Sequence, residues 1–185
     1  MNPIQKFSKD FFSQRIKTIG KKHVQGTFFR LVLAIHSEAI EETGPSFMVG
    51  GRYNLANEFG ALYLAESPEL CWQEKLKYYN NMPATIPSQT LGEFQIKINH
   101  CLDLTDPKTL KILGITIEEI IQPGNHYLTK MIGSAAWSSG VEAILVPSAV
   151  NSSQKNIVVF RDHLTSQSTV IRKKIGLYKM SLYKK

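Results

Sequence analysis

Extended and helical patterns follow one another along this chain without the regular alternation that a parallel βαβ sheet requires. Several segments have the period-two hydrophobicity, or the run of β-branched and aromatic residues, that is typical of strands. They are residues 27–33, 61–65, 90–104, 143–146, 156–160 and 168–183, the last long enough for one or two strands. Because strands outnumber helices and the order is mixed, the pattern favours an α+β fold over a doubly wound sheet.

Helices are predicted where the spacing of apolar residues lengthens to about three or four. The clearest has Ser67 as its N-cap and Pro68 in its first turn, and it runs to about Tyr79. The other helical stretches are 105–122, as short turns, and 127–137. The stretch from Gly44-Pro45 to Gly50-Gly51, between the first two strands, is predicted to be a loop.

The chain divides into a short N-terminal segment and one domain. In residues 1–22 the apolar side chains have helical spacing, which predicts a basic amphipathic helix packed on the domain. These side chains are Phe7, Phe11, Phe12, Ile16 and Ile19. Residues 23–185 are predicted to form a single domain, because no repeat, low-complexity stretch or long linker interrupts them.

The net charge of +7 is concentrated at the two ends of the chain. Residues 1–22 contain six basic residues and one acidic residue, and residues 172–185 contain six basic residues and no acidic one. The stretch between them has ten basic and fourteen acidic side chains. A nucleic-acid groove within the fold is therefore not expected; solvated ends, or a docking surface for an acidic partner, explain the basicity more simply.

Several classes of protein are excluded by what the sequence lacks. It has no Walker, dinucleotide-binding, zinc-protease or serine-hydrolase motif. No apolar run approaches the ~18 residues that cross a bilayer, so we expect a cytoplasmic protein without a membrane partner. Cys71 and Cys101 are predicted to be buried free thiols. The five histidines lack metal-ligand spacing, so no metal site is expected, and only His163 is expected near a site.

Arg52 and Tyr53 follow two adjacent glycines, Gly50 and Gly51. The glycines permit close approach of a ligand, and a guanidinium matches phosphate oxygens two at a time. Arg52 is therefore a candidate for binding a pyrophosphate, although the local sequence taken alone favours a surface arginine in a turn. Tyr53 is either a stacking ring or an aromatic residue of the turn.

Four residues further along the chain are also candidates. Tyr63 lies on a predicted strand and is either core or a ring that stacks on a heterocycle. Glu74 lies on the predicted helix and is either solvated or a partly buried carboxylate. Ser148 follows a buried strand, a common place for ligand-binding groups, but it lacks the context of a nucleophile. Asn156 begins the next strand.

Taken in order, these segments resemble the RES domain, which is named for its recurrent Arg, Glu and Ser. That family has a Gly-Gly-Arg-aromatic-Asn stretch, a strand with a Tyr, a helix with a Glu, and a Pro-Ser-Ala-Val stretch followed by an Asn. The corresponding residues are Gly50 to Asn54, Tyr63, Glu74, Pro147 to Val150 and Asn156. Arg30 also resembles part of the family's opening strand, and the resemblance covers about residues 25–185. The Asn-Pro that precedes a downstream His in the family is absent before His163.

The resemblance implies a split mixed β core similar to the ADP-ribosyltransferase fold, with flanking helices around an NAD+ cleft. Its members resemble toxins that deplete NAD+ and are blocked by a helical Xre-type antitoxin that occludes the cleft. By analogy, Arg52 would bind the pyrophosphate, Tyr53 and Tyr63 would position nicotinamide, and Ser148 with Asn156 would hydrogen-bond ribose or carboxamide. Glu74 would stabilise the oxocarbenium-like cation or orient the acceptor. The catalytic set would be Arg52, Tyr63, Glu74 and Ser148, with NAD+ as substrate and neither cofactor nor metal.

Three functions are compatible with these residues. The first is a toxin that cleaves the nicotinamide–ribose bond of NAD+, as a glycohydrolase or a phosphorylase. The second is a mono-ADP-ribosyltransferase that modifies a protein from the same cleft. The third is a non-catalytic binding module that uses the basic ends, which the division of charge disfavours. Whether the protein forms a homodimer stays open.

Overall fold

The computed structural model describes residues 8–79, 87–124 and 126–178. The start of the predicted N-terminal helix and the end of the predicted last strand, residues 179–183, lie outside them. Within this part of the chain the sheet has six strands in the order β1-β2-β5-β4-β3-β6, and β1 also pairs with β3. The strands are β1 (Lys22–Leu33), β2 (Leu62–Ala65), β3 (Gln89–Asp103), β4 (Ala143–Pro147), β5 (Lys155–Val159) and β6 (Thr169–Tyr178).

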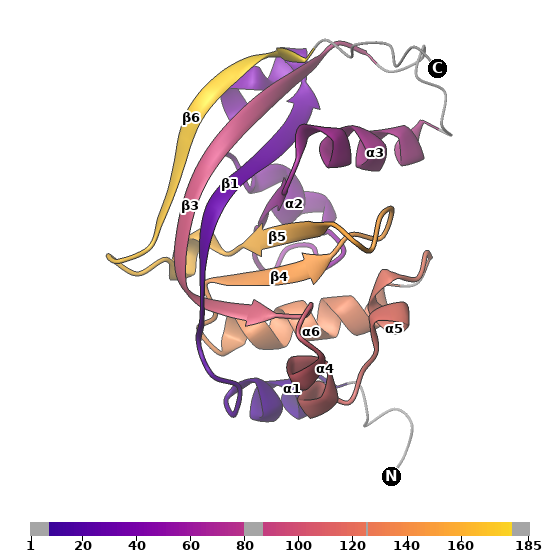
Figure 1. Ribbon diagram of the computed structural model, residues 1–185, viewed down its shortest axis with the longest axis vertical. Coiled ribbons are helices and arrows are strands. Elements are labelled where there is room, and N and C mark those ends of the chain that lie inside the picture. The colour runs from indigo at the N-terminus through magenta and orange to yellow at the C-terminus, as the bar shows by residue number, and fades with distance from the viewer. Residues whose placement is uncertain (1–7, 80–86, 125, 179–185) are drawn as a thin grey trace.

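The pairing of β1 with β3 closes five of these strands into a barrel-like core, and β6 lies outside the ring (Figure 1). The far edge of β3 is divided between two neighbours. Antiparallel β6 pairs with residues 89–97, and parallel β4 pairs with residues 101–103. This division of one long strand gives a split mixed sheet, and it confirms the predicted α+β fold.

Strands β4 and β5 separate two of the three hydrophobic clusters found among the described residues; the third lies under α3 around Leu70. Ile144 and Val158 face a cluster that includes residues of α1 (Lys9–Ile16), α4 (Pro107–Leu113) and α6 (Tyr127–Ser138). Their strand neighbours face the interior of the ring, where the core side chains include Phe28, Leu64, Phe94, Ile96, Leu145 and Ile157. A strand that is covered on both sides has a continuous apolar run, as the sequences of β4 and β5 do.

The predicted helices are present, but the N-terminal one is shorter than predicted: within the described residues it spans Lys9–Ile16, and residue 22 already opens β1. The Ser67 hydroxyl accepts a hydrogen bond of 3.0 Å from the backbone N–H of Leu70 and so caps α3 (Pro68–Tyr78). The short turns predicted over 105–122 are α4 and α5 (Ile117–Ile121). The N-terminal helix α1 packs against α6, and its Phe12 and Ile16 are buried in the same core cluster. None of the described helices is long and apolar enough to cross a membrane.

The loop predicted from Gly44-Pro45 to Gly50-Gly51 is wrong for residues 44–49, which form the short helix α2 (Gly44–Val49). A 3₁₀ segment over Ala34–Ala39 precedes it, directly after β1. Pro45 stands in the first turn of α2, where its missing N–H costs nothing, and Gly50 ends the helix with a φ of 72°. The same proline and glycine that indicate a loop thus mark the two ends of a helix of six residues.

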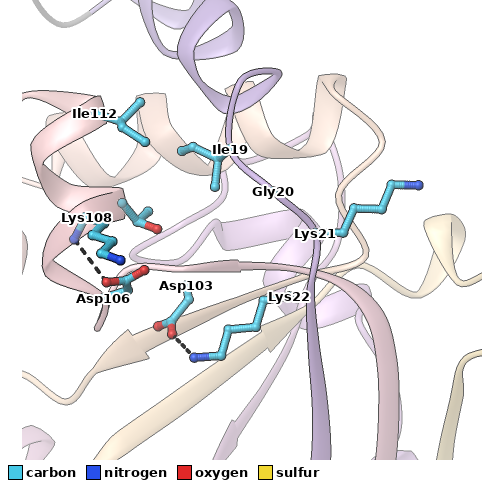
Figure 2. A pocket seen from close by; sticks show the side chains of 9 residues that line it. Ile19, Gly20, Lys21, Lys22, Asp103, Asp106, Lys108 and Ile112 are labelled. Atoms are coloured by element: carbon cyan, nitrogen blue, oxygen red, sulfur yellow. Dashed lines mark hydrogen bonds and ion pairs between the residues drawn. The ribbon is translucent and has the colours of Figure 1, made fainter.

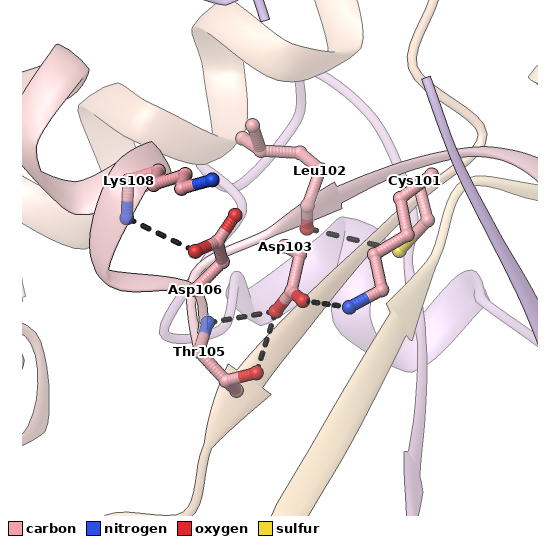
Figure 3. Close-up of polar contacts among 7 residues, drawn as sticks. Cys101, Leu102, Asp103, Thr105, Asp106 and Lys108 are labelled. Atoms are coloured by element: carbon pink, nitrogen blue, oxygen red, sulfur yellow. Dashed lines mark hydrogen bonds and ion pairs between the residues drawn. The ribbon is translucent and has the colours of Figure 1, made fainter. Parts of the chain in front are cut away.

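Basic residues near both ends of the chain belong to the sheet. Lys22 opens β1 and pairs with Asp103 at the end of β3 (Figure 2), and Asp103 also accepts hydrogen bonds from Thr105 (Figure 3). Arg172 and Lys174 on β6 form ion pairs with Glu41 and Glu93. The interpretation of the C-terminal basic run as a solvated tail is therefore wrong for residues 172–178, whose acidic partners come from distant parts of the sequence.

Both cysteines are free and buried, as predicted. Burial raises the pKa of the Cys71 thiol and of the Cys101 thiol to about 12. Neither thiol is therefore ionised near neutral pH, which removes them as nucleophiles.

Glu142 fastens the segment between β5 and β6 to β3. Its carboxylate is 1% exposed and accepts hydrogen bonds from two residues on β3 and two in that segment. The donors are the N–H groups of Asn99, His100 and Thr165 and the hydroxyls of Thr165 and Ser168, at 2.7–2.9 Å. Burial works to raise the pKa of Glu142, but these donors outweigh it and lower the pKa from 4.5 to about 2.

We expect Glu142→Gln to lower the free energy of unfolding at pH 7 by about 3 kcal/mol, because an amide cannot accept all these bonds. Because the folded-state pKa is lowered, the carboxylate stabilises fully above its ordinary pKa of 4.5 and loses this effect as the pH falls toward 2. Urea unfolding from pH 7 to pH 2 should show a shallower acid decline in the variant. Exposed Glu38→Gln is the control, and identical acid profiles for Glu142→Gln and wild type would contradict the prediction.

Candidate active site

A pocket of about 300 Å³ lies where α3 and α6 approach the loop that follows α2. Val49, the last residue of α2, and Gly50, Gly51 and Arg52 of the loop form one part of its wall. Helix α3 contributes Glu74 and Lys77, and α6 contributes Lys130 together with His126, the residue just before its first turn. In Figure 1, β4 and β5 lie between α3 and α6, and these strands supply the polar residues behind Glu74.

The Glu74 carboxylate is held through one of its two oxygens. Oε1 accepts a hydrogen bond of 2.8 Å from the Ser148 hydroxyl and one of 3.2 Å from the Asn156 side-chain amide. Oε2 has no hydrogen-bond partner among the described residues. Ser148 is fully buried, and its oxygen also accepts the N–H of Val150 at 3.2 Å. The structure thus brings three predicted site residues together and directs both donors at Glu74; their contact with ribose or carboxamide stays a prediction.

Arg52 connects the loop to the end of α5. Its Nη1 donates to the carbonyl oxygens of Ile120 and Gln122, at 3.0 and 3.2 Å. Its Nη2 and Nε have no partner within the described part of the chain. Because Nη1 is anchored to the protein, the Nη2 and Nε side of the guanidinium can donate two hydrogen bonds to a ligand in the pocket. This geometry is compatible with the predicted binding of a pyrophosphate.

Tyr63 and Asn54 brace the loop that carries Arg52. The Tyr63 hydroxyl accepts the backbone N–H of Tyr53 at 3.0 Å and donates to Asn54 Oδ1 at 2.8 Å. The Asn54 amide donates to the carbonyls of Ser46 and Phe59, at 2.7 and 2.9 Å, and the residue is fully buried. Tyr63 thus sets the position of Arg52 through its hydroxyl, a role that the sequence pattern of a β-strand does not reveal.

Two glycines allow the loop to pack this closely. A Cβ on Gly51 would lie 2.4 Å from the Tyr63 hydroxyl, and a Cβ on Gly133 of α6 would lie 1.8 Å from the carbonyl oxygen of Tyr53. Both contacts are too short for any side chain. The loop backbone therefore rests directly on α6, and Gly133 was not identified from the sequence because a glycine inside a helix indicates nothing specific by itself.

The Tyr53 ring does not line the pocket. It is 2% exposed and packs in the core cluster beside α6, where burial raises its pKa. The expectation that this ring stacks on or positions nicotinamide is not met by this geometry. Arg30, which resembles part of the family's opening strand, also lies outside the pocket lining; it donates to the carbonyls of Ile40 and Glu42, both at 3.0 Å.

The histidine in the pocket is His126, and the prediction that only His163 lies near the site is wrong. His163 stacks on Trp137, in the last turn of α6, with 5.0 Å between ring centres, whereas His126 precedes the first turn of that helix. The Nδ1 of His126 is buried and has no hydrogen-bond partner among the described residues. Desolvation lowers the His126 pKa, and the charges of Arg52, Lys130 and Lys77 lower it further. The ring is therefore neutral near pH 7.

The described residues include no group of three or more His, Cys, Asp or Glu side chains that could bind a metal ion. A second hollow of about 300 Å³ lies between the start of β1 and α4 (Figure 2). Its main carboxylate, Asp103, is already engaged by Lys22 and Thr105. The pocket around Glu74 is thus the better candidate for chemistry, because its carboxylate keeps a free oxygen.

Comparison with known proteins agrees with this geometry. Residues 28–178 match the model of the RES domain. The chain belongs to the RES domain family. It is 28% identical over 142 residues to the NAD(+) phosphorylases MbcT of Mycobacterium bovis and Mycobacterium tuberculosis, a match that covers 74% of this chain and 74% of each relative.

The solved Mycobacterium tuberculosis MbcT-MbcA toxin-antitoxin complex contains a chain with the same fold. The TM-score is 0.74 at 23% identity, and the match covers 91% of this chain and 92% of that chain. The RES fold expected from the resemblance is thereby confirmed.

We expect Gly133→Ala to lower the free energy of unfolding by about 3 kcal/mol, because the new methyl group collides with the Tyr53 carbonyl and displaces the Arg52 loop. Gly176→Ala on β6 is the matched control, since a Cβ there meets nothing within 4 Å. Urea unfolding of both variants measures the difference. Equal midpoints for the two variants would show that the contact is absent in solution.

Proposed function

We propose that this chain cleaves the nicotinamide–ribose bond of NAD+ and transfers the ADP-ribose unit to inorganic phosphate. The observation that carries the proposal is the Glu74 carboxylate, held by Ser148 and Asn156 with one oxygen free, in a pocket that also contains Arg52. The 28% identity to proteins named NAD(+) phosphorylase supports the choice of phosphate over water as acceptor.

The reaction needs little more than charge stabilisation. The electron pair of the glycosidic bond leaves with nicotinamide, which departs as a neutral molecule and needs no proton. The ribose carbon then carries oxocarbenium-like positive charge, which the Glu74 carboxylate stabilises. A phosphate oxygen donates an electron pair to this carbon, so the products are nicotinamide and an ADP-ribose phosphorylated at the anomeric position.

The remaining site residues position these groups. Arg52 binds phosphate oxygens of NAD+ with the edge of its guanidinium that α5 leaves free. Tyr63 holds the Arg52 loop through the N–H of Tyr53 and the side chain of Asn54. Ser148 and Asn156 fix the rotamer of Glu74, and no step requires a metal or a cofactor.

An enzyme that consumes NAD+ harms its own cell, and so it requires control. The likeness in fold to a chain of the MbcT-MbcA toxin-antitoxin complex supports a toxin that is neutralised by an antitoxin. A helical antitoxin that occludes the pocket around Glu74 would keep NAD+ out. We place the protein in the cytoplasm, where its substrate is found.

Glu74→Gln should lower the rate of nicotinamide release by about a hundredfold or more, because a neutral amide cannot stabilise the developing cation. Chromatography of NAD+ incubated with protein and phosphate measures nicotinamide and the phosphorylated product. Glu69→Gln, an exposed change on the same helix, is the control and should keep wild-type activity. Intact NAD+ with the wild-type protein would refute the proposal, and label transferred from NAD+ to a lysate protein would establish the ADP-ribosyltransferase alternative.

Ser148→Ala should lower kcat about tenfold and leave the KM for NAD+ nearly unchanged, because Ser148 is buried behind Glu74 and donates to it. Steady-state kinetics with varied NAD+ separates the two constants. Ser148→Thr keeps the hydroxyl and should recover part of the lost kcat. A rise in the KM with an unchanged kcat would instead indicate that Ser148 contacts the substrate itself.

A further inference from the structure

The pocket around Glu74 holds more positive charge than its own residues neutralise. Arg52, Lys77 and Lys130 line it, and Glu74 is the one carboxylate in its lining. None of the ion pairs found among the described residues involves any of these four side chains. Like charges that converge on a concave site without acidic partners repel one another, and an anionic ligand relieves that repulsion.

The two lysines and the neutral His126 come from two helices that both line the pocket. Lys77 lies three residues after Glu74 and thus on the same face of α3. His126 and Lys130 are separated by one turn at the N-terminus of α6, a helix of 12 residues. No side chain caps this terminus, so the positive end of the helix dipole adds to the charge of the lysines.

His126 adds a neutral hydrogen-bonding group to the same pocket lining. Its Nδ1 is buried and has no hydrogen-bond partner in the described part of the chain. Because Nδ1 has almost no accessible surface, a ligand in the pocket can meet this ring only through its Nε2 edge. In the tautomer that protonates Nε2, the ring would donate one hydrogen bond to a ligand oxygen beside Lys77 and Lys130.

We propose that Lys77, His126 and Lys130 form a phosphate-group subsite beside Glu74, separate from the phosphate contact assigned to Arg52. Lysines bind phosphate as compact point charges with several donors each, whereas a neutral imidazole adds one directed bond. The subsite rests on the proposed function, which supplies two sources of such a group: the pyrophosphate of NAD+ and the inorganic phosphate acceptor. Both present the same oxygen anions to the two lysines and His126.

The test compares Lys77→Gln, Lys130→Gln and the double variant with Lys111→Gln, an exposed lysine on α4 outside the pocket. Loss of one charged hydrogen-bond donor should weaken phosphate binding roughly tenfold. If the subsite binds the acceptor, the KM for inorganic phosphate rises roughly tenfold per lysine while the KM for NAD+ is retained. If it binds the pyrophosphate, the KM for NAD+ rises instead. Lys111→Gln should change neither constant.

Calorimetric titration with ADP-ribose and with inorganic phosphate keeps the subsite testable without catalysis. The double variant should lose affinity for one of the two ligands by roughly a hundredfold, even if the wild-type protein proves unable to cleave NAD+. The subsite is overturned if the double variant binds both ligands, and turns over NAD+, within about twofold of wild type. In that case, loss of nicotinamide release in Glu74→Gln would still support the proposed function.

His126→Phe keeps a ring but removes its nitrogens. This variant should lower the affinity for the same ligand that the lysine variants bind more weakly.

Discussion

The pairing of β1 with β3 is the interaction on which the remaining structure depends. It closes the ring of strands, and so it determines that β2, β5 and β4 lie side by side. Within that row Asn156 of β5 pairs with Ala65 of β2 on one side and with Val146 of β4 on the other. Helix α3 leaves the end of β2 through Ser67, so Glu74 returns over this same end of the row. The closed sheet thus brings residues from opposite halves of the chain to one carboxylate.

The loop that carries Arg52 is positioned by backbone contacts that few residues could support. Gly51 lies against the Tyr63 hydroxyl, and Gly133 lies against the Tyr53 carbonyl. Asn54 binds both ends of the loop through its amide. These contacts pack the loop backbone directly against α6 and the Tyr63 side chain, so Arg52 projects to the pocket from a closely packed support.

Much of the fold and the centre of the site could be predicted from the sequence. Alternating patterns locate the strands, Ser67 and Pro68 locate the start of α3, and the order of the segments indicates the family. The roles within the site were harder to predict. Tyr53 and Tyr63 are both tyrosines near two glycines, and only the direction of each side chain shows that one packs in the core and the other braces the loop.

Apart from Arg52, the basic side chains and the histidine of the pocket were not predicted from the sequence. Lys77, His126 and Lys130 form no motif, and they meet because α3, which packs on β1 and β2, and α6, which packs on β4 and β5, both reach the same pocket. Their spacing in the sequence carries no signal, since a lysine on an exposed helical face is ordinary. The short helix α2 was missed for a related reason, because six residues between a proline and a glycine give too few turns for a period to be recognised.

The basic residues of β6 lie along an edge of the sheet. This strand has a partner on one side only among the described residues, so its outer edge offers unpaired N–H and C=O groups to any other chain. Lys173 is the extra residue of a β-bulge between the partners of Glu93 and Phe94, and Lys174 stands beside it. A bulge bends the edge, and adjacent lysines repel an identical copy. Charge that resembles a tail in the sequence therefore lies on a sheet edge, where it disfavours pairing with a like-charged strand.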